Sequence, residues 1–231
     1  MYRYILFDAD NTLLDFDKAQ RLSFNEVLKH YGYQYSDQIF NQYEVINQNL
    51  WHQFELGLIE KKVVQEKRFL DFFSILGIKV DGAYADSVYQ ENLCKQSWLL
   101  PNAERICKDL SRHATLVIVT NGVGKTQRLR IANSKIAKYI SFVIVSEDVG
   151  YSKPNINFFI ETFKVIGCCK TDSILIVGDS IDSDIQGGIN VGIDTCWYNP
   201  YGKQTPMDLN INYIISNLNQ LSKIFAGDGI Y

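Results

Sequence analysis

The sequence predicts an α/β protein with a Rossmann-like parallel sheet as its core and an inserted α-helical cap domain. Two features of the chain predict this fold. Short apolar runs of strand length alternate with helix-like stretches over most of the chain, and the segment between the first two runs shows helical signals but no buried strand. Because 46% of the 231 residues are hydrophobic, the chain can bury a large core without a disulfide or a structural metal.

The expected strands are apolar runs in which polar and apolar residues do not alternate. This pattern is typical of parallel strands that helices cover on both faces. The runs lie at 4–7, 115–119, 142–145, 174–177 and 195–198, and a further edge strand is expected over 211–215. The helix-like stretches between them lie at 103–110, 126–137, 155–166 and 184–190, and the tail after Phe225 is expected to be loose.

The inserted segment has the signals of helices that are separated by glycines. Gly32 can terminate the first helix, and Ser36 can cap the second, which stops near Gly57. A third helix precedes Gly77, and a fourth covers 83–93. We interpret the insertion as a cap over the carboxyl edge of the sheet. The expected domains are a core of residues 1–15 and 99–231 and a cap of residues 16–98.

Composition limits the partners of the chain. Lys and Arg number 23 against 26 Asp and Glu, so the net charge of −3 provides no basic field to hold a nucleic acid polymer. No apolar run approaches the length of a membrane span, and the start is too short for a signal peptide. The five cysteines, among them Cys168 and Cys169, contain no Cys-x-x-Cys pair, which favours reduced thiols. We therefore expect a cytoplasmic protein, a monomer or weak homodimer, that acts on a small molecule.

The first polar segment at a strand end is Asp8-Ala9-Asp10-Asn11-Thr12, directly after the 4–7 run. Two carboxylates one residue apart repel each other and resist desolvation unless a cation lies between them. A hard cation with oxygen ligands, such as Mg²⁺, meets that need. An exposed turn that caps a helix is the alternative reading of this segment.

Two further segments follow later strands and suit the binding of an anion. Thr120 and Asn121 can donate hydrogen bonds to phosphate oxygens, and Gly122 permits close approach of the backbone. Lys153, which is followed by Pro154, can project an ammonium group toward the same edge. Taken alone, Thr120-Asn121-Gly122 is also a common turn, and Lys153 is also consistent with a solvated loop lysine.

The fourth segment contains Gly178, Asp179 and Asp184 and follows the 174–177 run. Gly178 allows a sharp turn, so that Asp179 can complete a metal site with Asp8. Asp184 is a further ligand or holds Asp179 in place, and helix capping is the alternative for Asp184. Because ligands bind at the carboxyl ends of parallel strands, the four segments are expected to converge on one site.

These four segments resemble the motifs of the haloacid dehalogenase (HAD) superfamily. Dehalogenases lack the second aspartate that phosphatases of this superfamily use as acid and base, so Asp10 favours phosphate chemistry. The resemblance also implies a helical cap inserted between the first and second motifs, and a metal bond from the Asp10 backbone carbonyl. The matching residues are Asp8 and Asp10 in Asp-x-Asp-x-Thr, Thr120 in the second motif, Lys153 in the third, and Asp179 and Asp184 in the fourth.

Within the cap, Trp51-His52-Gln53-Phe54-Glu55-Leu56-Gly57, with Arg68-Phe69 downstream, resembles bacterial pyrimidine 5′-nucleotidases of the YjjG or YfnB type. This resemblance implies a nucleoside monophosphate as substrate. Aromatic faces suit flat bases, which makes Trp51 and Phe54, and also Tyr43 and Trp98, candidates for base stacking. Alternatively, Trp51 and Phe54 pack the interior of the cap.

The expected reaction is hydrolysis of a phosphomonoester through an aspartyl-phosphate. Asp8 attacks phosphorus, and Mg²⁺ and Lys153 offset the repulsion between its carboxylate and the anionic phosphate. Asp10 protonates the leaving group and then takes a proton from water. Thr120 and Asn121 bind phosphoryl oxygens. The alternatives are a phosphatase for phosphoglycolate or a sugar phosphate, a phosphomutase, or a scaffold without turnover.

Overall fold

The computed structural model describes residues 2–168 and 170–226, so Cys169 and most of the tail after Phe225 lie outside the described residues. The chain divides into two compact units. The first unit consists of Met1–Phe16 and Ser97–Tyr231, and the second consists of Asp17–Gln96.

The described part of the first unit contains a parallel six-stranded sheet, which confirms the predicted α/β fold. The strand order is β3-β2-β1-β4-β5-β6, so β1 lies inside the sheet, between β2 and β4. The chain builds outward on one side of β1 and then crosses to the other side. The strands are β1 Tyr4–Phe7, β2 Thr115–Thr120, β3 Ile140–Val145, β4 Ile174–Gly178, β5 Asp194–Tyr198 and β6 Tyr213–Ile215.

The register of β1 brings three loops to one edge of the sheet. Phe7 is paired with Ile118 of β2 and with Val177 of β4. Because the strands are parallel, the residues that follow these positions leave the sheet side by side. A point where the strand order reverses is the usual ligand site of open α/β sheets.

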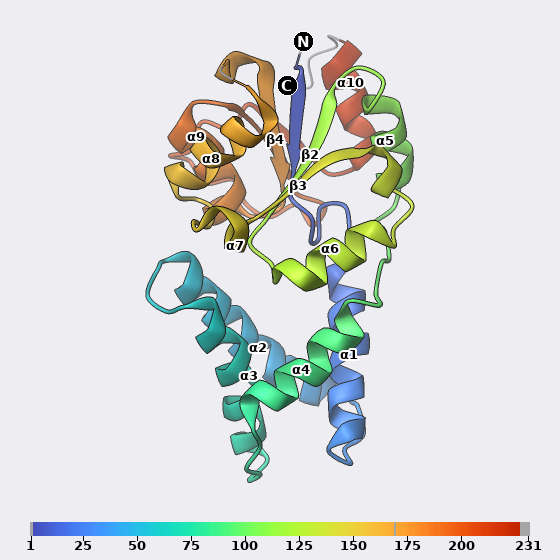
Figure 1. Ribbon diagram of the computed structural model, residues 1–231, viewed down its shortest axis with the longest axis vertical. Coiled ribbons are helices and arrows are strands. Elements are labelled where there is room, and N and C mark those ends of the chain that lie inside the picture. The colour runs from blue at the N-terminus through green and yellow to red at the C-terminus, as the bar shows by residue number, and fades with distance from the viewer. Residues whose placement is uncertain (1, 169, 227–231) are drawn as a thin grey trace. The chain divides into compact units, whose positions relative to one another are not determined.

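Helices cover both faces of this sheet, as Figure 1 shows, with α8 and α9 on one side and α5 and α10 on the other. One buried cluster joins Phe7 to Ile106 of α5 and Leu221 of α10. A second cluster joins Leu6 to Phe158 of α8. Burial on both faces explains why the strands read as uninterrupted apolar runs. The helices of this unit are α5 Ala103–Leu110, α6 Gly124–Ala132, α7 Ser146–Val149, α8 Ile156–Ile166, α9 Gln186–Val191 and α10 Leu221–Ala226.

The predicted helix at 126–137 is wrong at its carboxyl end. The helix α6 ends at Ala132, and Asn133 is its C-cap residue. The Ser134 hydroxyl donates to the Ile131 carbonyl at 2.6 Å, a local bond that competes with continuation of the helix. Another short helix, α7, has no counterpart among the predicted elements.

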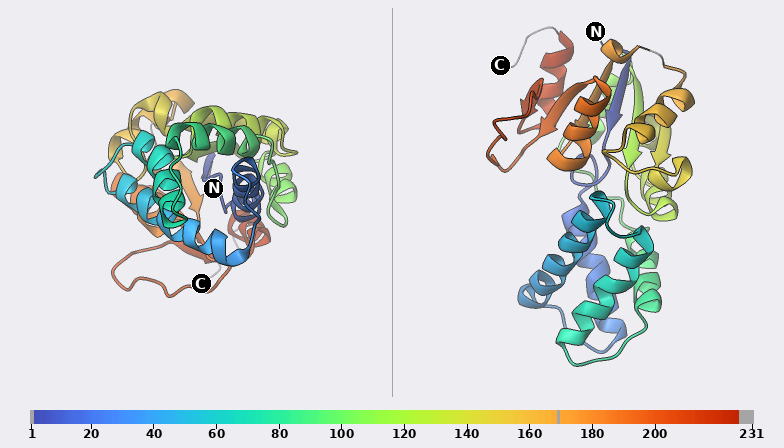
Figure 2. Two further views of the ribbon diagram at one scale, coloured as in Figure 1. Left: turned by 90° about the horizontal axis from the view of Figure 1, so that it is seen from below. Right: turned by 90° about the vertical axis from the view of Figure 1, so that its left-hand side faces the viewer.

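The second unit, all of which is described, consists of the helices α1 to α4 (Figure 2). Ser36 caps α2 by accepting from the Ile39 amide at 3.2 Å, and Gly32 and Gly77 have the positive φ angles of helix-ending glycines. The interior is aromatic, with the rings of Phe24 and Tyr43 stacked 4.2 Å apart. The helices are α1 Phe16–His30, α2 Asp37–Glu55, α3 Lys61–Ile75 and α4 Gly82–Leu93.

The two connections to the inserted segment lie side by side within the first unit. The Asp15 amide donates to the Trp98 carbonyl at 2.9 Å, and Leu14 forms an antiparallel bridge with Leu99. The insertion therefore leaves and re-enters the core at one place. Among the described residues, none of the helices has both the length and the apolar character of a membrane span.

Candidate active site

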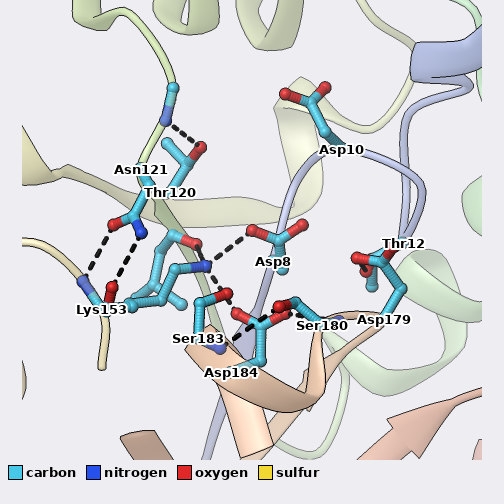
Figure 3. A network of polar contacts seen from close by, with 12 residues as sticks. Asp8, Asp10, Thr12, Thr120, Asn121, Lys153, Asp179, Ser180, Ser183 and Asp184 are labelled. Atoms are coloured by element: carbon cyan, nitrogen blue, oxygen red, sulfur yellow. Dashed lines mark hydrogen bonds and ion pairs between the residues drawn. The ribbon is translucent and has the colours of Figure 1, made fainter. Parts of the chain in front are cut away.

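Asp8 lies at the carboxyl end of β1, where its backbone continues the sheet. Its amide donates to the Val177 carbonyl of β4 at 2.9 Å, and its side chain is nearly buried. Lys153 Nζ donates to Asp8 Oδ1 at 2.7 Å (Figure 3). The first and third predicted segments are thus brought into direct contact.

The ammonium group of Lys153 is fully engaged. Besides Asp8, it donates to Asp184 Oδ1 at 2.7 Å and to the Val119 carbonyl at the end of β2 at 2.8 Å. The lysine side chain is 1% exposed, so these three acceptors replace its water. The ammonium group thus links β1, β2 and the loop after β4. Lys153 is therefore not a solvated loop lysine, which was the alternative interpretation.

Gly178 is required because the Asp184 side chain lies against it. A Cβ built on Gly178 would lie 2.5 Å from the Asp184 Cβ, a distance that real side chains do not adopt. Asp184 is carried by a π-helical turn, Ile181–Ile185, and its Oδ2 accepts from the Ser180 amide at 3.2 Å. The turn directs this carboxylate back toward Lys153, so Asp184 is not a helix cap on the surface.

Asp179 lies at the mouth of the same loop, held by its backbone. Trp197 Nε1 donates to the Asp179 carbonyl at 3.0 Å, while the side chain accepts from the Thr12 hydroxyl at 3.4 Å. Carboxylate oxygens of Asp8, Asp179 and Asp184 all lie within 4.8 Å of one another.

This carboxylate group fits a divalent cation. The described carboxylates Asp8, Asp179 and Asp184 lie around one ammonium group, that of Lys153, and the charge of Lys203 also acts on Asp179. Negative charge exceeds positive charge within this group, which favours a bound cation. Carboxylate oxygens are the ligands that Mg²⁺ prefers, so the donor set suits this ion.

The pKa values of the site reflect this excess of negative charge. Burial raises the pKa of Asp8 well above its usual range, the charges of Asp184 and Asp179 raise it further, and Lys153 opposes them. Burial and the charge of Asp184 raise the pKa of Asp179 to about 7. Burial alone would lower the pKa of Lys153, but Asp184 and Asp8 outweigh burial and raise it. The same excess of negative charge that favours a bound cation thus favours protonation of Asp8 and Asp179.

Thr120 presents a hydroxyl to the site at the end of β2. Its Oγ1 accepts from the Gly122 amide and from Gln127 Nε2, both at 3.1 Å. With both lone pairs occupied, the hydroxyl proton remains the group that can donate to an anion.

Asn121 makes two contacts that the sequence did not predict. Its Nδ2 donates to the Lys153 carbonyl at 2.9 Å, and its Oδ1 accepts from the Lys153 amide, also at 2.9 Å. Both heavy atoms of the amide thus bind the backbone of the lysine loop, and the second Nδ2 hydrogen remains for the predicted bond to a phosphoryl oxygen. Asn121 holds the loop of Lys153, whose peptide bond to Pro154 is cis.

Asp10 contacts two residues that the sequence did not single out. Gln127 Nε2 donates to Asp10 Oδ2 at 2.6 Å, and Arg130 Nη1 donates to Asp10 Oδ1. Both are carried by α6, three positions apart. Buried polar residues at this spacing look like an ordinary solvent face in the sequence, so only the proximity of the helix to the Thr120 loop could have identified them.

The aromatic candidates Trp51, Phe54 and Tyr43 belong to the helical unit. The Trp51 and Phe54 rings meet edge to face at 5.6 Å, and each is partly exposed. Tyr43, in contrast, is fully buried between the rings of Phe24 and Phe69. Its ring is therefore unavailable to a base, which corrects the prediction made for it. Trp98, the other candidate, lies in the first unit and is 48% exposed.

Comparison with known proteins agrees with this geometry. The chain is 34% identical to the HAD-hydrolase YfnB of Bacillus subtilis over 223 residues, with 96% of this chain and 95% of YfnB covered. It is 36% identical to the pyrimidine 5′-nucleotidase PynA of Streptococcus pneumoniae over 201 residues, covering 87% and 85% of the two chains. The pyrimidine 5′-nucleotidase YjjG of Escherichia coli is 29% identical, with coverage of 96% and 97%.

A solved structure shows the same fold. The crystal structure of the YfnB hydrolase bound to magnesium matches with a TM-score of 0.92 at 34% identity, covering 96% of this chain and 98% of that one. The sequence model of the family of haloacid dehalogenase-like hydrolases matches residues 5–198 of the chain, from β1 to the end of β5. That span includes every strand-end motif described above, so the predicted resemblance is confirmed. The chain belongs to the family of haloacid dehalogenase-like hydrolases.

Proposed function

We propose that the chain is a Mg²⁺-dependent phosphatase that hydrolyses nucleoside 5′-monophosphates, pyrimidine nucleotides foremost, through an aspartyl-phosphate on Asp8. The observation that carries this proposal is the contact of Lys153 Nζ with Asp8 Oδ1 at 2.7 Å, beside Asp179. A carboxylate nucleophile needs positive charge beside it in order to approach an anionic phosphate. The relatives PynA and YjjG, which are named as pyrimidine 5′-nucleotidases, support the substrate class.

Asp8 and Asp179, with the backbone carbonyl of Asp10, would hold the metal ion. When bound, Mg²⁺ supplies positive charge that polarises the phosphoryl group and lowers repulsion by the carboxylate. The magnesium in the related YfnB structure supports this choice of ion. Asp184 keeps Lys153 in place, because it accepts from the same ammonium group at 2.7 Å.

The protein side chains then divide the reaction into two steps. A carboxylate oxygen of Asp8 forms a bond to phosphorus while the bond to the leaving oxygen breaks, and Asp10 gives that oxygen a proton. In the second step a water oxygen attacks phosphorus, the bond to Asp8 breaks, and Asp10 takes a proton from the water. The Thr120 hydroxyl donates to a phosphoryl oxygen in both steps.

We also propose that the helical unit acts as a cap that selects the leaving group. Such an inserted unit excludes water during the reaction and opens to release product. Trp51 and Phe54 are its candidate contacts with the base.

The test is phosphate release with Mg²⁺ from UMP, dUMP, dTMP, purine monophosphates, phosphoglycolate and sugar phosphates, compared by kcat/KM. Highest kcat/KM for the pyrimidine nucleotides supports the proposal. Highest kcat/KM for phosphoglycolate or a sugar phosphate would replace the substrate but keep the reaction. Retention of phosphate on an isomerised substrate would indicate a mutase, and no turnover on any ester would indicate a scaffold.

The nucleophile is tested with Asp8→Asn, which we expect to lower kcat by more than 1000-fold, on the order seen when nucleophiles are removed. Acid-quenched wild-type enzyme should carry a phosphoryl group that hydroxylamine releases, and the variant should carry none. Asp182→Asn is the matched control, because this exposed carboxylate, in the turn Ile181–Ile185 after β4, undergoes the same change of charge. Substantial activity in freshly purified Asp8→Asn, free of deamidated protein, would exclude Asp8 as the nucleophile.

A further inference from the structure

Both carboxylate oxygens of Asp10 are held by one helix. Gln127 Nε2 donates to Oδ2 at 2.6 Å, and Arg130 Nη1 donates to Oδ1. Arg130 Nη1 also donates to Gln127 Oε1 at 3.0 Å, so the two residues fix each other. A carboxylate held at both oxygens has one orientation instead of a set of rotamers.

The ion pair between Arg130 and Asp10 is more deeply buried than an ordinary surface ion pair. The Arg130 side chain is 1% exposed and that of Asp10 is 26% exposed. Burying a guanidinium requires desolvation that a surface ion pair does not, and the guanidinium carbon of Arg130 lies 5.6 Å from the centre of the Phe16 ring. The buried arginine therefore pairs with a carboxylate that keeps part of its surface exposed.

Gln127 connects Asp10 to the phosphate-binding loop. The same Nε2 that donates to Asp10 also donates to Thr120 Oγ1 at 3.1 Å. A Cβ on Gly122 would lie 2.7 Å from Gln127 Cγ, so this glycine makes room for the glutamine. The acid and base group and the phosphate donor are therefore positioned by one amide.

We propose that Gln127 and Arg130 are positioning residues that hold the Asp10 carboxyl group in place for its proton transfers. In the first step a proton leaves the Asp10 carboxyl group for the oxygen of the leaving group as the bond from phosphorus to that oxygen breaks. In the second step a proton of the attacking water goes to Asp10 as the bond from phosphorus to Asp8 breaks. This inference rests on the proposed function and assigns residues to it.

The rival explanation is that Asp10 merely neutralises a structural arginine. The two explanations differ in how the leaving group affects the result. The alkoxide of UMP needs a proton from Asp10, whereas p-nitrophenolate leaves without one. Misplacing Asp10 therefore lowers the rate of the first step for UMP only. It slows hydrolysis of the aspartyl-phosphate for both substrates.

The experiment measures steady-state and rapid-mixing kinetics of Arg130→Met, Arg130→Lys and Gln127→Leu with UMP and with p-nitrophenyl phosphate. For the Met and Leu variants we expect kcat/KM for UMP to fall about 30-fold or more, within the range of acid and base catalysis. We expect kcat/KM for p-nitrophenyl phosphate to change less than about threefold, with a burst of p-nitrophenol before slow turnover. Arg130→Lys should restore part of the activity with UMP.

Arg128→Met is the matched control, because Arg128 is carried by the same helix and its side chain, paired with Asp148, is 46% exposed. It should behave as the wild type. Equal falls in kcat/KM for the two substrates, no burst, or faster turnover would overturn the inference. If Arg130→Met does not fold, Gln127→Leu decides, since it removes no charge. A wild-type enzyme inactive on both esters would overturn the proposed function and this inference together.

Discussion

Trp51 and Phe54 are two partly exposed aromatic residues at the end of α2. They meet edge to face at 5.6 Å, and Lys61 Nζ lies 5.5 Å from the centre of the Phe54 ring. The residues that follow, Leu56 and Leu58, are 60% and 68% exposed. Partly exposed aromatic faces beside apolar side chains suit a flat, apolar ligand group.

We expect Trp51→Ala to raise KM for UMP about tenfold and to change KM for p-nitrophenyl phosphate much less. Stacking of one base on an aromatic ring contributes about 1–3 kcal/mol, and 1.4 kcal/mol corresponds to a factor of ten. The measurement is steady-state kinetics with both substrates. Tyr84→Ala, at another exposed aromatic residue of the same unit, is the control. Equal increases for the two substrates would mean that Trp51 only packs the unit.

The contacts of single residues were predictable where strand ends decide them. Asp8, Lys153 and Asp179 follow apolar runs, and parallel strands bring such residues together. The orientation of the Asn121 amide was not predictable, because it depends on how the β2 loop faces the backbone of Lys153. Arg130 was missed for a related reason: a sequence does not reveal which face of a helix lies over a neighbouring loop.

A line of buried polar side chains crosses the helices of the second unit. Asn47 of α2 donates to Gln20 of α1 at 3.0 Å and accepts from Arg68 of α3 at 3.2 Å. Arg68 also pairs with Asp86 of α4, and both are almost completely buried. Because apolar helices can slide past one another, a line of buried polar contacts of this kind fixes their register.

We expect Asp86→Leu to destabilise the protein by about 3–5 kcal/mol, because it leaves the Arg68 guanidinium buried without its carboxylate. Urea unfolding followed by circular dichroism measures the loss. The double variant with Arg68→Met should recover most of the stability, since no buried charge remains. Asp71→Ala is the control, because its exposed ion pair with Lys67 on α3 is worth less than about 1 kcal/mol. A loss for Asp86→Leu no larger than for Asp71→Ala would contradict the assigned role.

For the helices and strands, the sequence indicated which segments form which kind of element. It was less informative about where each element ends and about the order of the strands in the sheet. The strands were recognisable because both of their faces are buried, and the helices of the second unit because serine and glycine mark their ends. The end of α6 depends on a local bond of Ser134, which a periodic pattern does not reveal. The strand order is set by crossovers and cannot be deduced from the runs themselves.

For the whole molecule, the acidic edge makes stability depend on pH and on metal. The pKa of Asp179 is raised to about 7, and that of Asp8 is raised also, so the folded chain binds protons that the unfolded chain releases. The stabilisation is therefore present at about pH 4 and is lost as pH rises toward about 7. Above that range the carboxylates are charged and need a cation.

We expect the rise in Tm on adding Mg²⁺ to be larger at pH 8 than at pH 5.5. Protons compete with the ion for the same oxygens, and ion at 100 times its Kd stabilises the fold by about 2.7 kcal/mol. The measurement is thermal unfolding of chelator-treated protein with and without Mg²⁺, at matched ionic strength. Asp179→Asn should lose most of the Mg²⁺ effect. An increase of the same size at both pH values would contradict the assignment of these carboxylates.

The paired connections at Leu14 with Leu99, and at Asp15 with Trp98, have a consequence for the order of folding. Joining β1 to β2 closes a loop that contains the whole of Asp17–Gln96, at an entropic cost on the order of 4 kcal/mol if that loop is a flexible coil. Helices that form early within the loop shorten it, because a folded segment has far fewer conformations to lose. We therefore expect the helical unit to assist the pairing of the strands that hold Asp8 and Thr120, so that destabilising it slows the assembly of the sheet.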